Sequence, residues 1–153
     1  MNTKSFQFDL ELDLIPTVSD AAPHVIIRID DLVLFDSFLS AAETVKYNCK
    51  LTEGSHLLDI QFLNKSAADS VQAVQIKRLL INGIVDDRFI WNGIYYPEYP
   101  EPWASEQQAL GNMLSPELQN VNYLGWNGSW QLELTSPVFT WIHKTCALGW
   151  IYD

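Results

Sequence analysis

Two apolar runs in the stretch Gly54–Gly83 constrain the fold more than any other part of the chain. The first run, His56–Leu63, places apolar side chains at every second position, and the second run, Val74–Ile81, keeps a similar alternation. Turn residues bound the pair, Glu53-Gly54 before it and Asn82-Gly83 after it. A period of two residues is typical of β-strands. The stretch therefore predicts two neighbouring strands of a β-sandwich.

Other runs extend the same pattern along the chain. The clearest alternates Phe and Leu with acidic residues before Pro16, and Asp30-Asp31 is the expected turn of a tight hairpin. Repeated short strands between turn signals are typical of sandwiches and barrels. We expect an all-β, antiparallel, jelly-roll-like β-sandwich that forms a single domain over residues 1–153. Beyond the two runs above, the expected strands are Phe6–Leu14, His24–Ile29, Leu32–Phe38, Thr44–Leu51, Trp130–Thr135 and Val138–Ile142.

One long insertion, residues 85–122, breaks this pattern. It contains several prolines and no sustained period, but its many aromatic residues argue against disorder. Long insertions in compact domains are usually functional when they are not disordered. Within the insertion, Ser105–Gln108 followed by apolar residues predicts one short helix capped at Ser105.

The insertion also supplies the candidate ligand-binding residues. Trp and Tyr rings stack on the apolar C–H faces of sugars and offer a polar edge to hydroxyl groups. Two alternatives stay open, because such rings also fold back onto a sheet as a second core or anchor a protein interface. The candidate carbohydrate-binding residues are Trp91, Tyr95, Tyr96, Tyr99 and Trp103. Truncation is expected to destabilise the protein at Trp91, beside a strand end, and to be nearly neutral at Trp103, between stiffening prolines.

Composition excludes several classes of function. The formal net charge of −10 repels phosphate backbones, so we expect no nucleic-acid partner. No apolar run is long enough to span a membrane, and Met1–Asp9 lacks the apolar core of a signal peptide. We therefore expect no membrane partner, and a cytoplasmic or virion-associated protein. Cys49 and Cys146 have no metal-binding spacing and are expected to be buried reduced thiols, with a long-range disulfide as the alternative.

Catalytic patterns are also missing from the sequence. The three histidines, His24, His56 and His143, lack zinc-site spacing, and no nucleophile elbow or phosphate loop occurs. We expect no cofactor, no catalytic residue and no enzyme activity. His56 is expected to pack at the end of its strand. The acids of the first strand are expected to form a solvated face, and Asp86-Asp87 a solvated turn.

The central stretch resembles the calcium-dependent xylan-binding carbohydrate-binding modules and their jelly-roll relatives. The likeness covers about residues 23–84 and includes the strand–turn–strand segment Val25–Asp36. It implies a β-sandwich that recognises a polysaccharide or other glycan without catalysis. The matching residues form Gly-x-His, Phe-x-Asn and Ile-Asn-Gly motifs: Gly54, His56, Leu58, Ile60, Phe62, Asn64, Ile81, Asn82 and Gly83.

The chain departs from that family at its calcium loop. The family has an acid directly after Phe-x-Asn and further acids in the following loop, and these hold calcium. Here Lys65 follows Asn64, and the loop Ser66–Ser70 contains a single carboxylate, Asp69. Because a calcium ion takes about six to eight oxygen ligands, we predict no tight calcium site near Asn64.

A second resemblance concerns the C-terminal third. Leu124–Trp130 and Pro137–Trp141 resemble segments of uncharacterised β-sandwich proteins of marine bacteriophages. This likeness implies the alternative function, a structural or interaction protein such as a virion or tail component. Such a protein would have protein partners or form a homo-oligomer.

Overall fold

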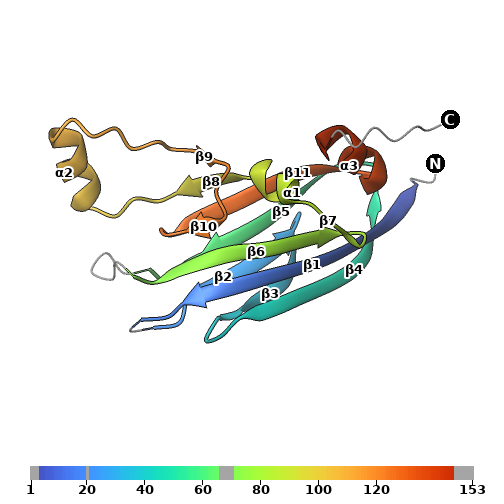
Figure 1. Ribbon diagram of the computed structural model, residues 1–153, viewed down its shortest axis with the longest axis horizontal. Coiled ribbons are helices and arrows are strands. Elements are labelled where there is room, and N and C mark those ends of the chain that lie inside the picture. The colour runs from blue at the N-terminus through green and yellow to red at the C-terminus, as the bar shows by residue number, and fades with distance from the viewer. Residues whose placement is uncertain (1–3, 20, 66–70, 147–153) are drawn as a thin grey trace.

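A computed structural model describes residues 4–19, 21–65 and 71–146 and shows two antiparallel β-sheets packed face to face (Figure 1). The strands are β1 (Ser5–Thr17), β2 (His24–Ile29), β3 (Leu32–Phe38), β4 (Glu43–Thr52), β5 (Gly54–Phe62), β6 (Ala73–Ile81), β7 (Ile84–Val85), β8 (Ile94–Pro97), β9 (Leu118–Gln119), β10 (Tyr123–Leu124) and β11 (Gly128–Ser136). The helices are α1 (Asp87–Trp91), α2 (Trp103–Ala109) and α3 (Val138–Cys146). The predicted all-β sandwich is confirmed.

The chain crosses repeatedly between the two sheets. The five-stranded sheet has the order β10-β6-β1-β4, with β7 paired to β6, and the six-stranded sheet has the order β3-β2-β5-β11-β8-β9. The prediction that β5 and β6 are neighbouring strands is wrong, because β5 pairs with β2 and β11 while β6 pairs with β1. Alternation shows which side chains face the core, but it does not show which sheet a strand joins.

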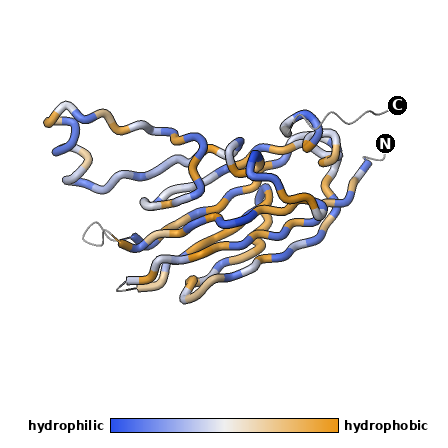
Figure 2. Tube along the Cα trace, in the orientation of Figure 1, coloured by the Kyte–Doolittle hydropathy of each residue, from blue (hydrophilic) through white to orange (hydrophobic). Residues whose placement is uncertain are grey.

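The core lies between the sheets and consists of the alternate apolar residues of both layers. Figure 2 shows hydrophobic and hydrophilic residues alternating along the strands. In β1 every second residue from Phe8 to Leu14 is buried, and the residues between them are partly exposed. On the other face of β1, the acids Glu11 and Asp13 form ion pairs with basic side chains of the neighbouring strands. Glu11 lies 3.2 Å from Lys46 Nζ, and Asp13 lies 3.0 Å from Arg78 Nε. The outer face of the five-stranded sheet is thus a solvated face, as expected.

The run Val138–Ile142, predicted as a strand, is the helix α3. Its buried residues Val138, Trp141 and Ile142 have the i, i+3, i+4 spacing of a helix that covers a core, while Phe139 is half exposed. Pro137 stands just before the helix, a position that proline tolerates well. A short run of aromatic and branched residues does not distinguish a strand from a buried helix, which explains the error. The helix contacts β11, α1 and β1 at one end of the sandwich.

The insertion contains more regular structure than predicted. Its β8 joins the six-stranded sheet, β9 pairs with β8, and the segment 98–117 between them extends as an arm that carries α2 (Figure 1). The predicted helix exists, but Ser105 does not begin it: the cap position is Pro102. Ser105 instead donates from its backbone nitrogen and hydroxyl to Glu101 Oε2, at 3.2 and 2.6 Å. An acidic side chain before the helix takes the capping role because it also suits the positive end of the helix dipole.

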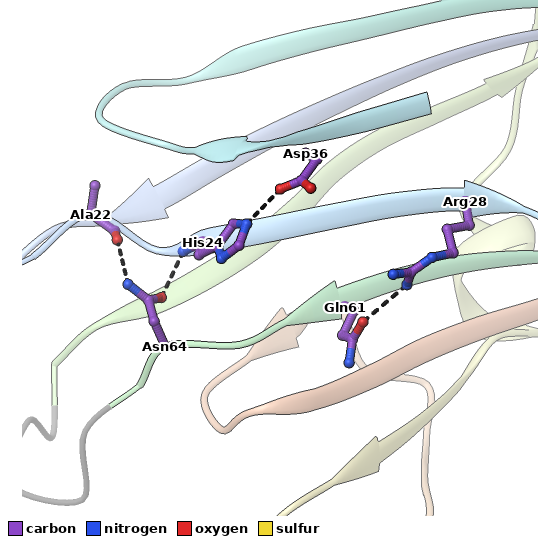
Figure 3. Close-up of polar contacts among 6 residues, drawn as sticks. All are labelled: Ala22, His24, Arg28, Asp36, Gln61 and Asn64. Atoms are coloured by element: carbon purple, nitrogen blue, oxygen red, sulfur yellow. Dashed lines mark hydrogen bonds and ion pairs between the residues drawn. The ribbon is translucent and has the colours of Figure 1, made fainter. Parts of the chain in front are cut away.

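Three polar residues of the family-like motifs hold strand ends together. The Asn64 amide accepts from His24 N at 2.6 Å and donates to the Ala22 carbonyl at 2.9 Å (Figure 3). Asn82 likewise accepts from the backbone of Asp9 at 2.7 Å, across the sheet from its own turn. The third residue, His56, joins two turns. These three residues therefore stabilise the fold.

Cys49 is a half-buried free thiol, so the structure does not contain the alternative disulfide. Burial raises the pKa of its thiol, and the nearby Asp9 and Asp30 carboxylates raise it further. The side chain of Cys146 lies outside the described residues. Within the described ranges, no helix has both the length and the apolar character needed to cross a membrane.

His56 lies between two acceptors at the end of β5, with a side chain only 9% exposed. Its Nδ1 is 2.6 Å from Asp30 Oδ2, and its Nε2 is 2.7 Å from the Thr52 carbonyl. Because only a doubly protonated ring donates in both directions, the geometry selects the imidazolium. Burial opposes the charge, but the Asp30 and Thr52 hydrogen bonds outweigh it, so the pKa of His56 is raised.

This raised pKa predicts a pH-dependent stability. A histidine whose pKa is higher in the folded state stabilises the protein fully below its unfolded pKa of about 6.5, and the effect is lost as the pH rises through the folded value. His56→Gln is therefore expected to lower the free energy of unfolding more at pH 5.5 than at pH 8.5, as measured by urea denaturation. In an Asp30→Asn background, which retains an acceptor for Leu57 N, this pH dependence should shrink. An equal loss at both pH values would contradict the imidazolium assignment.

Candidate functional site

The five candidate ligand-binding residues do not form one surface. Trp91, at the end of α1, is 53% exposed and lines a cavity of about 190 Å³ with Lys77 and Asn122. Tyr95 is 1% exposed and belongs to the core, whereas Tyr96, the next residue of β8, lies on the outer face of the six-stranded sheet. Only two of the five candidates, Tyr99 and Trp103 in the arm, contact each other. From the sequence, truncation is expected to destabilise the protein at Trp91 and to be nearly neutral at Trp103. These positions do not fit that expectation, because Trp91 is the more exposed of the two side chains.

Tyr99 and Trp103 meet Trp126 at the base of the arm and form an aromatic cluster of three partly exposed rings. The ring centroids lie 4.9 Å apart for Trp103 and Trp126, 5.8 Å for Tyr99 and Trp126, and 6.1 Å for Tyr99 and Trp103. These spacings are those of attractive aromatic pairs. Lys65 Nζ lies 5.2 Å from the centroid of the Trp126 ring, within the range of a cation–π contact.

Trp126 is the site residue that the sequence analysis missed. It sits in the short connection between β10 and β11, and its position is fixed by a buried tyrosine. The Tyr95 hydroxyl donates to the Trp126 carbonyl and accepts from the Trp126 backbone nitrogen at 3.0 Å. Burial raises the pKa of Tyr95, which keeps this hydroxyl a donor. Tyr95 therefore supports the aromatic cluster from below instead of stacking on a ligand. The sequence signal that could have identified Trp126 is an aromatic residue beside a turn, in the segment Leu124–Gly128.

Backbone contacts hold the segments around the aromatic cluster in register. Asn127 accepts from Lys65 N at 2.7 Å and donates to the Lys65 carbonyl at 2.9 Å. Glu98 N donates to the Asn127 carbonyl at 2.7 Å, and the Tyr99 hydroxyl donates to the Ser115 carbonyl at 2.7 Å. The rings thus come from a fixed junction between the arm, the β10–β11 connection and the end of β5.

A cavity of about 320 Å³ opens beside the aromatic cluster, and its walls include Lys65, Tyr123 and Trp126. No Lys or Arg occurs in the sequence from residue 89 to residue 143. The cation that contacts the aromatic cluster, Lys65, comes from the end of β5. The cluster offers aromatic faces, one ammonium group and backbone polar atoms. Such a set can bind and orient a ligand, and the residues named here include no nucleophile with an adjacent base.

The residues around Asn64 do not fit a calcium site. Both amide atoms of Asn64 are used in backbone hydrogen bonds, and the backbone of Lys65 is paired with Asn127. Within the ranges that the structure describes, no three His, Cys, Asp or Glu side chains gather closely enough to hold a metal. The loop Ser66–Ser70, with Asp69, lies outside the described residues. The absence of a tight calcium site therefore stays a prediction.

Comparison with known structures agrees with the fold. The chain is similar to vCBM60 in complex with galactobiose, with a TM-score of 0.51 and 12% sequence identity over 81% of this chain and 96% of that one. It is equally similar to the selenomethionine form of vCBM60, with a TM-score of 0.51 and 13% identity over 82% of this chain and 89% of that one. The description of that structure states that circular permutation provides an evolutionary link between two families of calcium-dependent carbohydrate-binding modules. No family model and no curated protein matches the sequence. At this level of identity the likeness shows a shared β-sandwich fold.

The support of Trp126 by Tyr95 gives a stability prediction. Tyr95→Phe leaves the Trp126 nitrogen and carbonyl without their buried partner, which is expected to cost about 1–3 kcal/mol of unfolding free energy. Tyr99→Phe is the matched control, because it removes one exposed hydrogen bond and should cost about 1 kcal/mol or less. Urea denaturation midpoints measure both, and equal effects would show that Tyr95 does not hold the Trp126 segment.

Calcium dependence is tested by thermal unfolding. A ligand that binds only the folded state stabilises it by RT ln(1 + [L]/Kd), so a micromolar site at millimolar calcium would add about 4 kcal/mol. We expect the melting curves in millimolar calcium and in chelator to coincide. A shift of several degrees toward higher temperature in calcium would disprove the prediction.

Proposed function

We propose that the chain is a non-catalytic, carbohydrate-binding module-like protein whose aromatic cluster binds a glycan. The observation that carries this proposal is the junction of three partly exposed rings, Tyr99, Trp103 and Trp126. One of them, Trp126, also lines a cavity of about 320 Å³. Sugars present C–H faces to such rings and hydroxyl groups to the polar atoms around them. The likeness to vCBM60 in complex with galactobiose supports the ligand class.

The rigidity of the aromatic cluster favours binding. A ring that is already fixed loses little side-chain entropy when a ligand stacks on it. Trp126 is held through Tyr95 and Asn127, and Trp103 opens α2 directly after two prolines of the arm. The rings do not need to be ordered by the ligand.

Charge narrows the class of glycan. The arm carries the acids Glu98, Glu101, Glu106 and Glu117 without a cation, and the whole chain has a net charge of −10. A field of this sign repels polyanions and has little effect on neutral sugars. We therefore propose neutral oligosaccharides as ligands, with recognition by stacking and hydrogen bonding.

The proposal is tested by calorimetric titration with galactobiose and with xylobiose. Trp126→Ala and Trp103→Ala are each expected to weaken binding by at least about tenfold, since truncation of a central aromatic anchor commonly costs 2 kcal/mol or more. Trp91→Ala is the matched control: it removes an equally large ring from α1, remote from the arm in Figure 1, and should change neither binding nor stability by more than about 0.5 kcal/mol. Unchanged affinity in Trp126→Ala, or loss of binding in Trp91→Ala, would refute this assignment.

A structural or interaction role, such as that of a virion or tail component, is the second candidate function. Its support is the end of the arm beyond α2, where Leu110 is 74% and Met113 is 93% exposed. Exposed apolar side chains on a projecting segment suit a protein contact. If the chain self-associates in sedimentation and Leu110→Ser with Met113→Ser abolishes the association while glycans fail to bind, this second function is favoured.

A further inference from the structure

A second cavity, of about 180 Å³, lies away from the aromatic cluster on the outer face of the six-stranded sheet. Its floor is formed by side chains of β8 and β11, namely Ile94, Tyr96, Gln131 and Glu133. Its wall is formed by Asn92, at the end of α1, and by Trp141 of α3. Because α1 and α3 lie at the border of the sheet, they form a wall beside this part of its face, and the cavity is partly open.

The close approach of β8 to β11 fixes the floor of this cavity. Gly93 and Gly128 flank the pairing, and both positions lack room for a side chain. A Cβ at Gly93 would lie 2.2 Å from the buried Trp130 ring, and one at Gly128 would lie 2.2 Å from the Tyr96 carbonyl. The register then sets Gln131 opposite Ile94. The groups that face the cavity are therefore preorganised.

Gln131 is held from its other side by Asp59 of β5, its direct cross-strand partner. Burial raises the pKa of Asp59, while the Arg28 charge and hydrogen bonds from Gln131 and Ser129 oppose that rise. Gln131 thus lies between Asp59 on one neighbouring strand and Ile94 on the other, with its side chain half buried. Arg28 is itself held by Gln61 at 3.0 Å (Figure 3).

Asp59, the cross-strand neighbour of Gln131, has one buried carboxylate oxygen, Oδ1, without a hydrogen-bond partner among the described residues. A buried polar atom without a partner costs about 1–3 kcal/mol. Asp59 is not among the residues that line the cavity, so the choice of ligand does not depend on it. The cavity itself offers the half-buried Gln131, the exposed Glu133 and the Tyr96 ring, 36% exposed, and this mixture of polar groups and an aromatic face suits a hydroxyl-rich ligand.

We propose that this cavity, defined by Asn92, Ile94, Tyr96, Gln131, Glu133 and Trp141, is a second saccharide subsite that takes one sugar unit. Its ligand class rests on the function proposed above. The size follows from the volume, which is below the roughly 300–1,000 Å³ of sites for larger ligands. Tyr96 supplies the stacking face, and Gln131, Glu133 and Asn92 supply acceptors and donors for hydroxyl groups.

The two sites share one strand and face opposite ways. Tyr95 lies under the aromatic cluster, while Tyr96 enters the second cavity, because successive side chains of a strand point to opposite faces. A long glycan that reaches both sites would bind more tightly than a short one, since the second contact is intramolecular.

The inference is tested by amide chemical-shift mapping of the 15N-labelled protein with galactose, galactobiose and xylobiose. Saturable shifts are expected in two separate groups, residues 94–96 with 131–133 for the second subsite, and residues 125–127 for the aromatic cluster. Tyr96→Ala and Glu133→Gln should each weaken the first group at least about tenfold and leave the affinity of the second group within twofold. Thr135→Ala, on the same exposed face of β11 but outside the cavity, is the matched control.

The outcomes separate the two proposals. Shifts at residues 125–127 alone would overturn the second subsite and leave the proposed function standing. Shifts at residues 94–96 and 131–133 alone, lost in Tyr96→Ala, would support the subsite and refute binding at the aromatic cluster. No shift at either group with any of the three sugars would overturn both.

Discussion

The pairing of β8 with β11 is the contact on which both proposed sites depend. The buried Trp130 ring occupies the space that a side chain at Gly93 would need, and the Tyr96 carbonyl does the same at Gly128. Two glycines thus let a short strand from an otherwise irregular insertion approach the sheet closely. Since close packing in protein interiors leaves few alternatives, this contact fixes β8 in position and orientation. The arm, the cavity and the aromatic rings follow from it.

The fold likeness and the functional groups come from different parts of the chain. His56, Asn64 and Asn82 carry the resemblance to calcium-dependent modules, and each of them satisfies backbone groups at a strand end. Buried or half-buried backbone groups must find partners, so residues of this kind are needed wherever the architecture recurs. Ligand-binding groups are under no such requirement. A shared sandwich is therefore compatible with a binding surface of its own, built on the insertion.

Aromatic content alone did not predict which rings lie together. The five rings of the insertion divide among an exposed helix end, the core, the outer sheet face and the arm, because a strand turns neighbouring residues to opposite sides. Tyr95 and Tyr96 are adjacent in sequence and serve different sites. Trp126 lies outside the insertion, and its position in the aromatic cluster depends on Tyr95 and on the contact between Lys65 and Asn127, which joins two distant loops.

The sequence by itself determined the all-β class, most strand positions, the buried face of β1 and the tight turns at Asp30 and Asn82, both of which have positive φ. These features depend on local periodicity and backbone preference, which neighbouring residues set. Only the tertiary structure decided that β5 and β6 lie in opposite sheets, that Val138–Ile142 is helical, and that Trp103 meets Trp126. These features depend on contacts between segments far apart in the chain, which the short local patterns of the sequence do not determine.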